Sequence, residues 1–426
     1  MHRDHLVEID AILAAALKAA DPCAAVSAAV KRSPPRASRP AVIAVGKAAP
    51  SMMLGYVDAC PGSTDHITVV PEGVQAPPTA VVADHPFPTQ RSVEAARRVK
   101  GFVETIAAGL AANDGFVVLL SGGASSLLTF PVPGLGLEDY AKATRELLQS
   151  GVDIRTLNCI RKHCEQLKGG RLAALMGALP CDTYILSDVV GDELETVGSG
   201  PTLPDSTTFA DACRAFDRQF KFTHAARALL PHLREGALGK FPETPKPGAL
   251  PGSKAYLVAS NLSAVRAAAQ EARNRGRSDV VTRTGIVGST ALAGQRLAAE
   301  AIEHATPGAI IYGGETTVDV QGKRGRGGRN QELGLAAALE IDGYKGITIA
   351  AFATDGVDGP TDAAGVIVSG ETCAQAAAAG LDPRSALAEH DSYTFFDALG
   401  RAGYPHLIRT GPTGTNVNDL AIALTD

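Results

Sequence analysis

Short polar clusters follow several apolar runs in this sequence, and they hold the residue types best suited to chemistry. Each run has the length of a buried strand, and each cluster combines glycine with hydroxyl, basic or acidic side chains. Ligands of open α/β sheets bind beyond the carboxyl ends of the strands, so these clusters predict a binding site. The clusters are Gly46-Lys47, Ser121–Ser126, Ser187-Asp188 continuing to Asp192, Gly313-Gly314-Glu315 and Thr354-Asp355-Gly356.

The segment SGGASS suits a bound phosphate or small carboxylate. Its glycines let the backbone approach an anion, and a helix opening there would offer free N–H groups. A tight glycine turn with a serine helix cap is an equally good interpretation. The candidate ligands in this segment are Ser121, Gly122, Gly123, Ser125 and Ser126.

Basic residues are placed where they could hold phosphoryl oxygens. Lys47 directly follows a strand pattern, and a cation there can offset charge in a transition state. Arg324, Arg326 and Arg329 lie among glycines in GKRGRGGRNQE and could clamp an anion in bidentate fashion. The alternatives are a solvated lysine and an exposed basic loop. Arg329 directly precedes a predicted helix, which favours it over the other two arginines.

Acidic residues supply candidate metal ligands in two segments. Asp188 and Asp192 are candidates because Mg²⁺ is held by carboxylate oxygens together with water and substrate phosphates. Asp355 and Asp358 could position a metal or a hydroxyl group. In both segments the alternative is a polar loop whose acids form turns or caps.

The elements that would position these residues alternate between strand and helix patterns. Such alternation predicts α/β architecture with a doubly wound parallel sheet. Expected strands cover 41–46, 66–70, 80–84, 115–120, 182–188, 255–260, 309–320 and 346–356, and expected helices cover 92–112, 138–150 and 154–176.

A Pro- and Gly-rich segment without periodicity, residues 236–253, predicts a linker between two domains. We place the first domain at residues 1–245 and a second, smaller α/β domain at residues 254–426. A chain of 426 residues is long enough for two cores of this kind.

Composition excludes several classes of function. The formal net charge of −5 disfavours sequence-independent binding to nucleic acid, and no apolar run approaches the length of a membrane span. The N-terminus carries early acids instead of a secretory signal, and the seven cysteines show no CxxC pattern. These features predict a cytoplasmic protein, and they leave open whether it forms a homodimer.

Common catalytic and nucleotide-binding motifs are absent. The sequence contains no GxxxxGK[ST], no GxGxxG after its first strand pattern and no GxSxG. From the residues alone, we predict an α/β enzyme that acts on a small anionic ligand.

Eight motifs occur in a fixed order along nearly the whole chain. They are AVGKAAPSM, LLSGGASSLL, KGGR, LSDVVGDELETVGSGPT, GGETTV, GRGGRNQE, ATDGVDGPTDAAG and TGPTGTNVNDL. Taken together, these motifs resemble the glycerate 2-kinase family, which has an N-terminal glycerate kinase domain and a C-terminal MOFRL domain.

The resemblance implies a Rossmann-like first domain, a MOFRL second domain and an active site in the cleft between them. It implies phosphorylation of D-glycerate to 2-phosphoglycerate with ATP and Mg²⁺. Lys47 and Arg329 map to the motif residues expected to stabilise the phosphoryl group, with Asp188 beside the metal. The further site residues are Lys168, Arg171, Glu315 and Asn330 for substrate or phosphate, and Asp188, Asp192 and Asp355 for metal.

Two other functions stay open. Some family members carry the name hydroxypyruvate reductase, but an NAD(P)H-dependent enzyme should show a dinucleotide-binding fingerprint. A non-catalytic sensor of sugar acids or phosphate would share the anion-binding loops without needing the acids between Asp188 and Asp192.

Overall fold

A computed structural model describes residues 3–62, 65–109, 111, 113–150, 152–219, 226–304, 306–320 and 325–426. The chain divides into two compact units. The first unit contains Pro22–Ser187 and Asp192–Val258, and the second contains Met1–Asp21, Asp188–Gly191 and Ala259–Asp426. The units interleave along the chain, whereas the predicted domains 1–245 and 254–426 are continuous.

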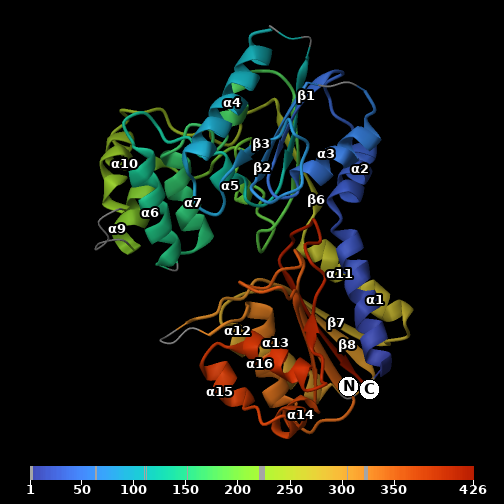
Figure 1. Ribbon diagram of the computed structural model, residues 1–426. Helices are drawn as coiled ribbons and strands as arrows, with labels where there is room; N and C mark the ends of the chain where they lie inside the picture. The colour runs from blue at the N-terminus through green and yellow to red at the C-terminus, as the bar shows by residue number, and fades with distance from the viewer. Residues whose placement is uncertain are drawn as a thin grey trace. The chain divides into compact units, whose positions relative to one another are not determined.

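The first unit is built on a six-stranded sheet with the order β3-β2-β1-β4-β5-β6. The pairs from β3 through β5 are all parallel. Figure 1 shows α2 and α3 on one face of this sheet and α4 and α5 on the other. Its strands are β1 (Pro40–Val45), β2 (His66–Pro71), β3 (Val81–Ala83), β4 (Gly115–Leu120), β5 (Cys181–Leu186) and β6 (Ser253–Ala259). Its helices are α2 (Pro22–Arg32), α3 (Ala49–Ala59), α4 (Gln90–Ala107), α5 (Ala124–Leu127), α6 (Leu137–Gln149), α7 (Ile154–His163), α8 (Arg171–Leu175), α9 (Phe209–Gln219) and α10 (Leu230–Ala237), with 3₁₀ turns η1 (Val197–Ser199) and η2 (Ala226–Ala228).

Local sequence explains the central strands of this sheet. β1 and β4 are continuous apolar runs, and every residue in both is buried. Strands covered by helices on both faces need no polar side, so their sequences do not alternate. This places β1 and β4 side by side at the centre of the unit.

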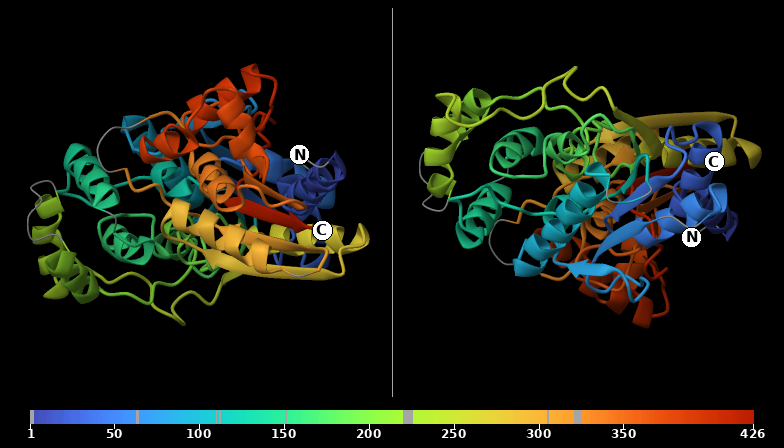
Figure 2. Two further views of the ribbon diagram at one scale, coloured as in Figure 1. Left: turned by 90° about the horizontal axis from the view of Figure 1, so that it is seen from below. Right: turned by 90° about the horizontal axis from the view of Figure 1, so that it is seen from above.

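Helices α6, α7, α9 and α10 form a group with its own core. Their apolar faces meet at Tyr140, Leu147, Ile160, Phe209 and Leu233, which are all almost fully buried. Both views of Figure 2 show these green and yellow-green helices gathered side by side.

The second unit is built on a mixed sheet with the order β11-β10-β9-β12-β8-β7. β12 runs antiparallel between β8 and β9, and β7 runs parallel to β8. Its strands are β7 (Asp279–Ile286), β8 (Gly308–Gly314), β9 (Ile347–Ala353), β10 (Gly365–Ser369), β11 (Leu407–Ile408) and β12 (Asp419–Thr425). Its helices are α1 (Arg3–Ala19), α11 (Asn261–Asn274), α12 (Thr290–Glu303), α13 (Arg329–Glu340), α14 (Thr372–Ala378), α15 (Pro383–Ala388) and α16 (Ser392–Arg401).

The first helix of the chain belongs to this second unit, where it packs on α11. Both chain ends lie together in each view of Figure 2. His5 hydrogen-bonds Thr348 and Asp426, and Arg277 forms an ion pair with Glu8. These contacts tie the N-terminal segment to the last strand.

The expected α/β architecture and the expected strands are confirmed, but two expectations differ from the structure. The single helix expected over 154–176 is interrupted between His163 and Arg171, where Gly169 and Gly170 both have positive φ. The segment 236–253 contains little regular structure but makes tertiary contacts, such as the hydrogen bond from Thr244 to Asp205. None of the described helices is long and apolar enough to cross a membrane.

Candidate active site

Lys47 and the SGGASS segment meet at the centre of the first sheet. Both follow the adjacent strands β1 and β4, where the winding of the chain reverses direction. The backbone N–H of Lys47 donates to the carbonyl of Gly122 at 2.9 Å. The side chain of Lys47 has no hydrogen bond or ion pair within the described part of the chain. This switch point is where parallel sheets of this order bind ligands.

The SGGASS backbone forms a tight turn that packs against His85 and Lys47. Gly123 has φ of 89°, and an added Cβ would meet the His85 ring at 3.0 Å. Among described residues, no acceptor contacts the N–H groups of Gly122, Gly123 or Ala124. The helix that follows, α5, has four residues, so its dipole adds little and the N–H groups themselves must hold the anion.

Hydroxyl groups extend from this turn. Ser125 hydrogen-bonds Ser199, and Ser199 donates to Asn158. Ser126 donates to the carbonyl of Gly123, so it caps the turn. Burial, and then the nearby charge of Lys47, lowers the pKa of His85 to about 4. The imidazole of His85 is therefore neutral near pH 7.

A second polar cluster lies in the second unit, where strand β8 ends and strand β12 begins. Glu315 follows β8, and Asp419 opens β12 opposite Gly314 and Ala353. Arg329, at the start of α13, donates from Nε and Nη2 to both carboxylate oxygens of Asp419. Its Nη1 lies 3.0 Å from Glu315. Burial would lower the pKa of Arg329, but Asp419 and Glu315 raise it overall.

Asp358 caps the helix that carries Arg329. Its carboxylate accepts hydrogen bonds from the backbone N–H groups of Asn330 and Gln331, at 3.0 and 2.8 Å, and from the Asn330 amide. The side chain of Asn330 is thus engaged inside the cluster. Burial raises the pKa of Asp358 to about 6 although these hydrogen bonds oppose it.

Sequence reasoning missed two residues of this cluster. Asp419 and Asn418 lie in the TGPTGTNVNDL motif, but the strand pattern that follows them was not recognised as β12. Asn418 has φ of 64°, and its buried Nδ2 has no hydrogen-bond partner among the described residues. An acid immediately before the final apolar run was the signal that could have identified Asp419.

The predicted metal ligands are distributed over both units. Asp188 belongs to the second unit, and Asp192 belongs to the first. Asp355 follows β9 and accepts from the backbone of Val357 in a local turn. The described residues contain no group of three or more His, Cys, Asp or Glu side chains placed to hold a metal. The donors present fit a Mg²⁺ that arrives on nucleotide phosphates and needs one or two carboxylates.

The KGGR segment places its two charged side chains in different settings. The buried Lys168 donates to Glu165 at 2.7 Å and to the carbonyl of Leu128. Arg171 lines a cavity that has no lining residue in common with the two clusters above.

The basic loop before α13 is only partly described. Arg326 lies over the ring of Tyr393, 4.2 Å from its centroid, rather than in the cluster of Arg329. Arg324 lies outside the described residues.

The sheet order and the two clusters define an α/β protein built to bind small anionic ligands. The chain belongs to the glycerate 2-kinase family. Residues 8–234 match a profile described as a domain of unknown function (DUF4147), and residues 308–419 match the MOFRL family. The resemblance seen in the sequence is confirmed.

Relatives of this chain are known in several organisms. The glycerate 2-kinase of Pyrococcus horikoshii is 37% identical, over 96% of this chain and 94% of that protein. A protein of Agrobacterium vitis named as a hydroxypyruvate reductase is also 37% identical, over 97% and 93%. The crystal structure of glycerate kinase from Thermotoga maritima superposes with a TM-score of 0.83 at 35% identity, covering 97% of this chain and 98% of that one.

Proposed function

We propose that this protein transfers the γ-phosphoryl group of ATP to D-glycerate and forms 2-phosphoglycerate. The observation that carries the proposal is the placement of Lys47 beside open backbone N–H groups at the switch point of the first sheet. The glycerate kinases among the relatives of this chain support the choice of substrate.

The proposed reaction is an in-line displacement at the γ-phosphorus. The 2-hydroxyl oxygen of glycerate forms the new P–O bond and loses its proton to solvent. The bond from the γ-phosphorus to the β-phosphate oxygen breaks, and ADP leaves. Lys47 and Arg329 offset the charge on the phosphoryl oxygens. The N–H groups and hydroxyls of SGGASS hold an anionic group of the substrates. Asp419 orients Arg329, and Glu315 lies beside its third nitrogen.

Mg²⁺ supplies charge neutralisation of the ATP phosphates. Asp188, Asp192 and Asp355 are the carboxylates that would hold it. A cytoplasmic location, a homodimer and a substrate contact by Lys168 remain predictions from the sequence. The predicted substrate contact of Arg171 is not kept in this proposal, because Arg171 lines a cavity that shares no residue with the two clusters.

An enzyme-coupled assay tests the reaction and its regiochemistry. The protein is given ATP, Mg²⁺ and D-glycerate, and enolase converts 2-phosphoglycerate to phosphoenolpyruvate, which is measured. A signal without phosphoglycerate mutase supports the proposal, and a signal only with the mutase would assign the 3-hydroxyl.

The name of the Agrobacterium vitis relative favours a second candidate, a hydroxypyruvate reductase. Oxidation of NADH by hydroxypyruvate, without any kinase signal, would replace the proposed function with this one. The absence of GxGxxG after β1 favours the kinase.

Replacing Lys47 tests its role directly. Lys47→Ala should lower kcat at least about a hundredfold, as loss of one preorganised charge donor typically does. Lys142→Ala is the matched control, because Lys142 is an exposed lysine of the same unit. Near wild-type turnover by Lys47→Ala would remove Lys47 from the mechanism.

A further inference from the structure

The first unit contains a cavity that the proposed reaction does not use. Its volume is about 480 Å³, within the range of small-molecule sites. The KGGR segment, the start of α9, α10 and the irregular segment before β6 all contribute to its wall. We call it the Arg171 cavity.

Arg171 is the polar group in this wall whose hydrogen-bonding capacity is least used. Its buried Nε has no partner among the described residues, and its Nη2 reaches the carbonyl of Pro242 only at 3.5 Å. It forms no ion pair in the part of the chain that the structure describes. A guanidinium carries five N–H donors, and leaving buried donors unpaired costs free energy.

The two carboxylates in the wall are already engaged elsewhere. Glu165 accepts from Lys168 and from the backbone of Phe130, at 2.7 and 2.6 Å. Glu243 accepts from Lys246 at 3.1 Å and from the backbone of Phe209 at 3.0 Å.

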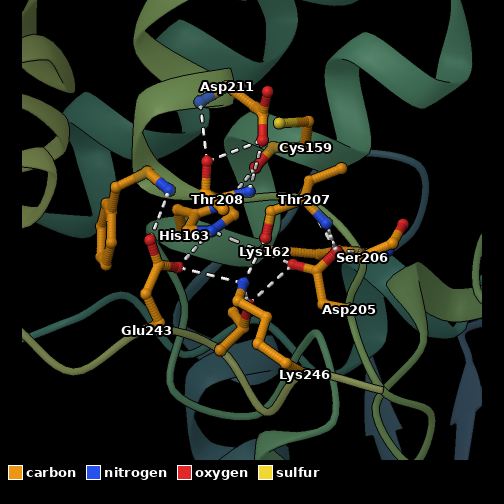
Figure 3. Close-up of polar contacts among 12 residues, drawn as sticks. Cys159, Lys162, His163, Asp205, Ser206, Thr207, Thr208, Asp211, Glu243 and Lys246 are labelled. Carbon is orange, nitrogen blue, oxygen red and sulfur yellow. Dashed lines mark hydrogen bonds and ion pairs between the residues drawn. The ribbon is translucent and has the colours of Figure 1, made fainter.

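The surroundings of Glu243 reinforce this arrangement. Figure 3 shows its carboxylate between Lys246 and His163, whose Nε2 lies 3.2 Å away. Lys162 lies beside Asp205 in the same buried network. Burial would raise the pKa of Glu243, but its hydrogen bonds to Phe209 and Lys246 lower it overall. Glu243 therefore pairs with Lys246, and its charge, like that of Asp205, acts on Arg171 without forming an ion pair with it. Arg171 keeps donors that can face a ligand in the cavity.

Two further polar residues line the wall, and both have partners: Lys100 pairs with Glu104, and Gln166 donates to the carbonyl of Pro131. Most of the remaining wall is aromatic and apolar. The His232 ring stacks on Phe241 with centroids 4.6 Å apart and meets Phe209 edge-on at 5.7 Å. Burial, as the largest cause, lowers the pKa of His232, so this ring is neutral near pH 7. Val132 and Leu175 add aliphatic surface.

We propose that the Arg171 cavity is a second ligand site, which binds a small organic anion. Its ligand has a carboxylate or phosphate group, held in bidentate fashion by Arg171, on an aromatic or apolar body that contacts Phe241 and His232. Inorganic phosphate alone fills neither the volume nor the apolar wall, so both parts of the ligand are required. The site is separate from the one proposed for ATP and glycerate.

Isothermal titration calorimetry with phenyl phosphate tests this site in the full-length protein. Phenyl phosphate should bind at least tenfold more tightly than inorganic phosphate and than benzyl alcohol. Arg171→Met removes the charge, and Ala174→Phe fills the cavity from an exposed position of α8 while keeping the charge. Each should weaken binding at least tenfold, with helix content unchanged by circular dichroism.

Two control variants locate the binding. Arg214→Met removes an exposed arginine of α9, and Lys47→Ala alters the proposed catalytic site. Both should bind phenyl phosphate as the wild type does, and saturating ATP or D-glycerate should not displace it. No binding by the wild type, equal binding by Arg171→Met and Ala174→Phe, loss of binding in Lys47→Ala, or displacement by either substrate would each overturn the proposal.

Discussion

At the residue scale, Arg329 is held by two carboxylates before any phosphate arrives. Asp419 engages two of its nitrogens and Glu315 a third. Asp419 is almost fully buried, while Glu315 is exposed at the rim. The buried acid therefore fixes the direction of the guanidinium. In the proposed reaction, the exposed acid is the one that the phosphoryl group would replace.

Asp419→Asn should lower kcat about tenfold or more and should also lower the melting temperature. Asp419 is the bidentate partner of Arg329, and removing one charge of a largely buried ion pair leaves the other charge poorly compensated. The variant keeps a hydrogen-bond acceptor but loses the charge that orients Arg329. Steady-state kinetics and thermal unfolding measure the two effects.

The control for this variant is Asp397→Asn, because Asp397 pairs with Arg401 and Arg409 in the same unit outside the cluster. Unchanged kcat in Asp419→Asn would show that Arg329 does not depend on Asp419.

Asp358 predicts a pH dependence of stability. Its pKa rises from an ordinary 3.8 to about 6 on folding, so the folded state binds the proton more tightly than the unfolded state. Its contribution to stability is full below pH 3.8 and is lost as pH rises through 6. Asp358→Asn should thus gain roughly 2 kcal/mol relative to wild type between pH 4 and pH 7.

Urea unfolding of both proteins at the two pH values measures this gain. Asp355→Asn is the comparison variant, since Asp355 is part of the same loop but less buried. A pH-independent difference between wild type and Asp358→Asn would contradict the buried, proton-binding carboxyl.

At the element scale, the start of α13 depends on a close approach between its N-cap and a loop from another part of the sheet. Gly328 precedes the helix, and an added Cβ there would lie 2.2 Å from Cγ of Asp358. Glycine is needed because the carboxylate occupies the space of a side chain. Gly328 of the GRGGRNQE motif therefore allows α13 to begin beside Asp358, and this places Arg329 at the first position of the helix.

Gly328→Ala should destabilise the protein by about 1–3 kcal/mol, the usual cost of overpacking. Gly400→Ala is the matched control, because Gly400 lies in helix α16 of the same unit and its added Cβ meets nothing within 4 Å. That change should be neutral or stabilising by up to about 1 kcal/mol. Chemical denaturation measures the free energy of unfolding of both variants. Equal values would contradict the close approach between Gly328 and Asp358.

The strands show which elements sequence patterns can predict. β1 and β4 were recognised because continuous apolar runs followed by glycine are hard to place anywhere except in a buried parallel sheet. β7 was missed because most of its side chains are only partly buried or exposed, so its sequence is polar. β12 was also missed, although it is a continuous buried run like β1 and β4.

At the scale of the whole molecule, segments that are far apart in the sequence belong to the same compact unit. Helix α1 precedes the strands of the first sheet in the sequence, but it belongs to the second unit. Its residues Ile9, Ile12 and Leu13 are buried. The profile match to residues 8–234 treats the same helix as part of the N-terminal family. Stability of the second unit therefore depends on residues at the far end of the sequence.

Ile12→Ala should destabilise the second unit by about 2–5 kcal/mol, as expected for a fully buried side chain. Hydrogen exchange should lose protection in α11 and β12 but not in β1 and β4. The control is Ile154→Ala, because Ile154 is 45% exposed at the start of α7. Equal loss of protection in both units would mean that they unfold together.

The sequence by itself determined the architecture and the loops that follow the strands. Apolar periodicity and glycine punctuation act locally, so they predicted the alternating elements, Lys47 and SGGASS. The order of motifs was specific enough to indicate the family. Only the tertiary structure decided how Arg329 is held and what surrounds Arg171. The partners of Arg329 lie 14 and 90 residues away along the chain, and the walls of the Arg171 cavity come from separate segments. Such contacts arise from packing between distant elements, which no local pattern encodes.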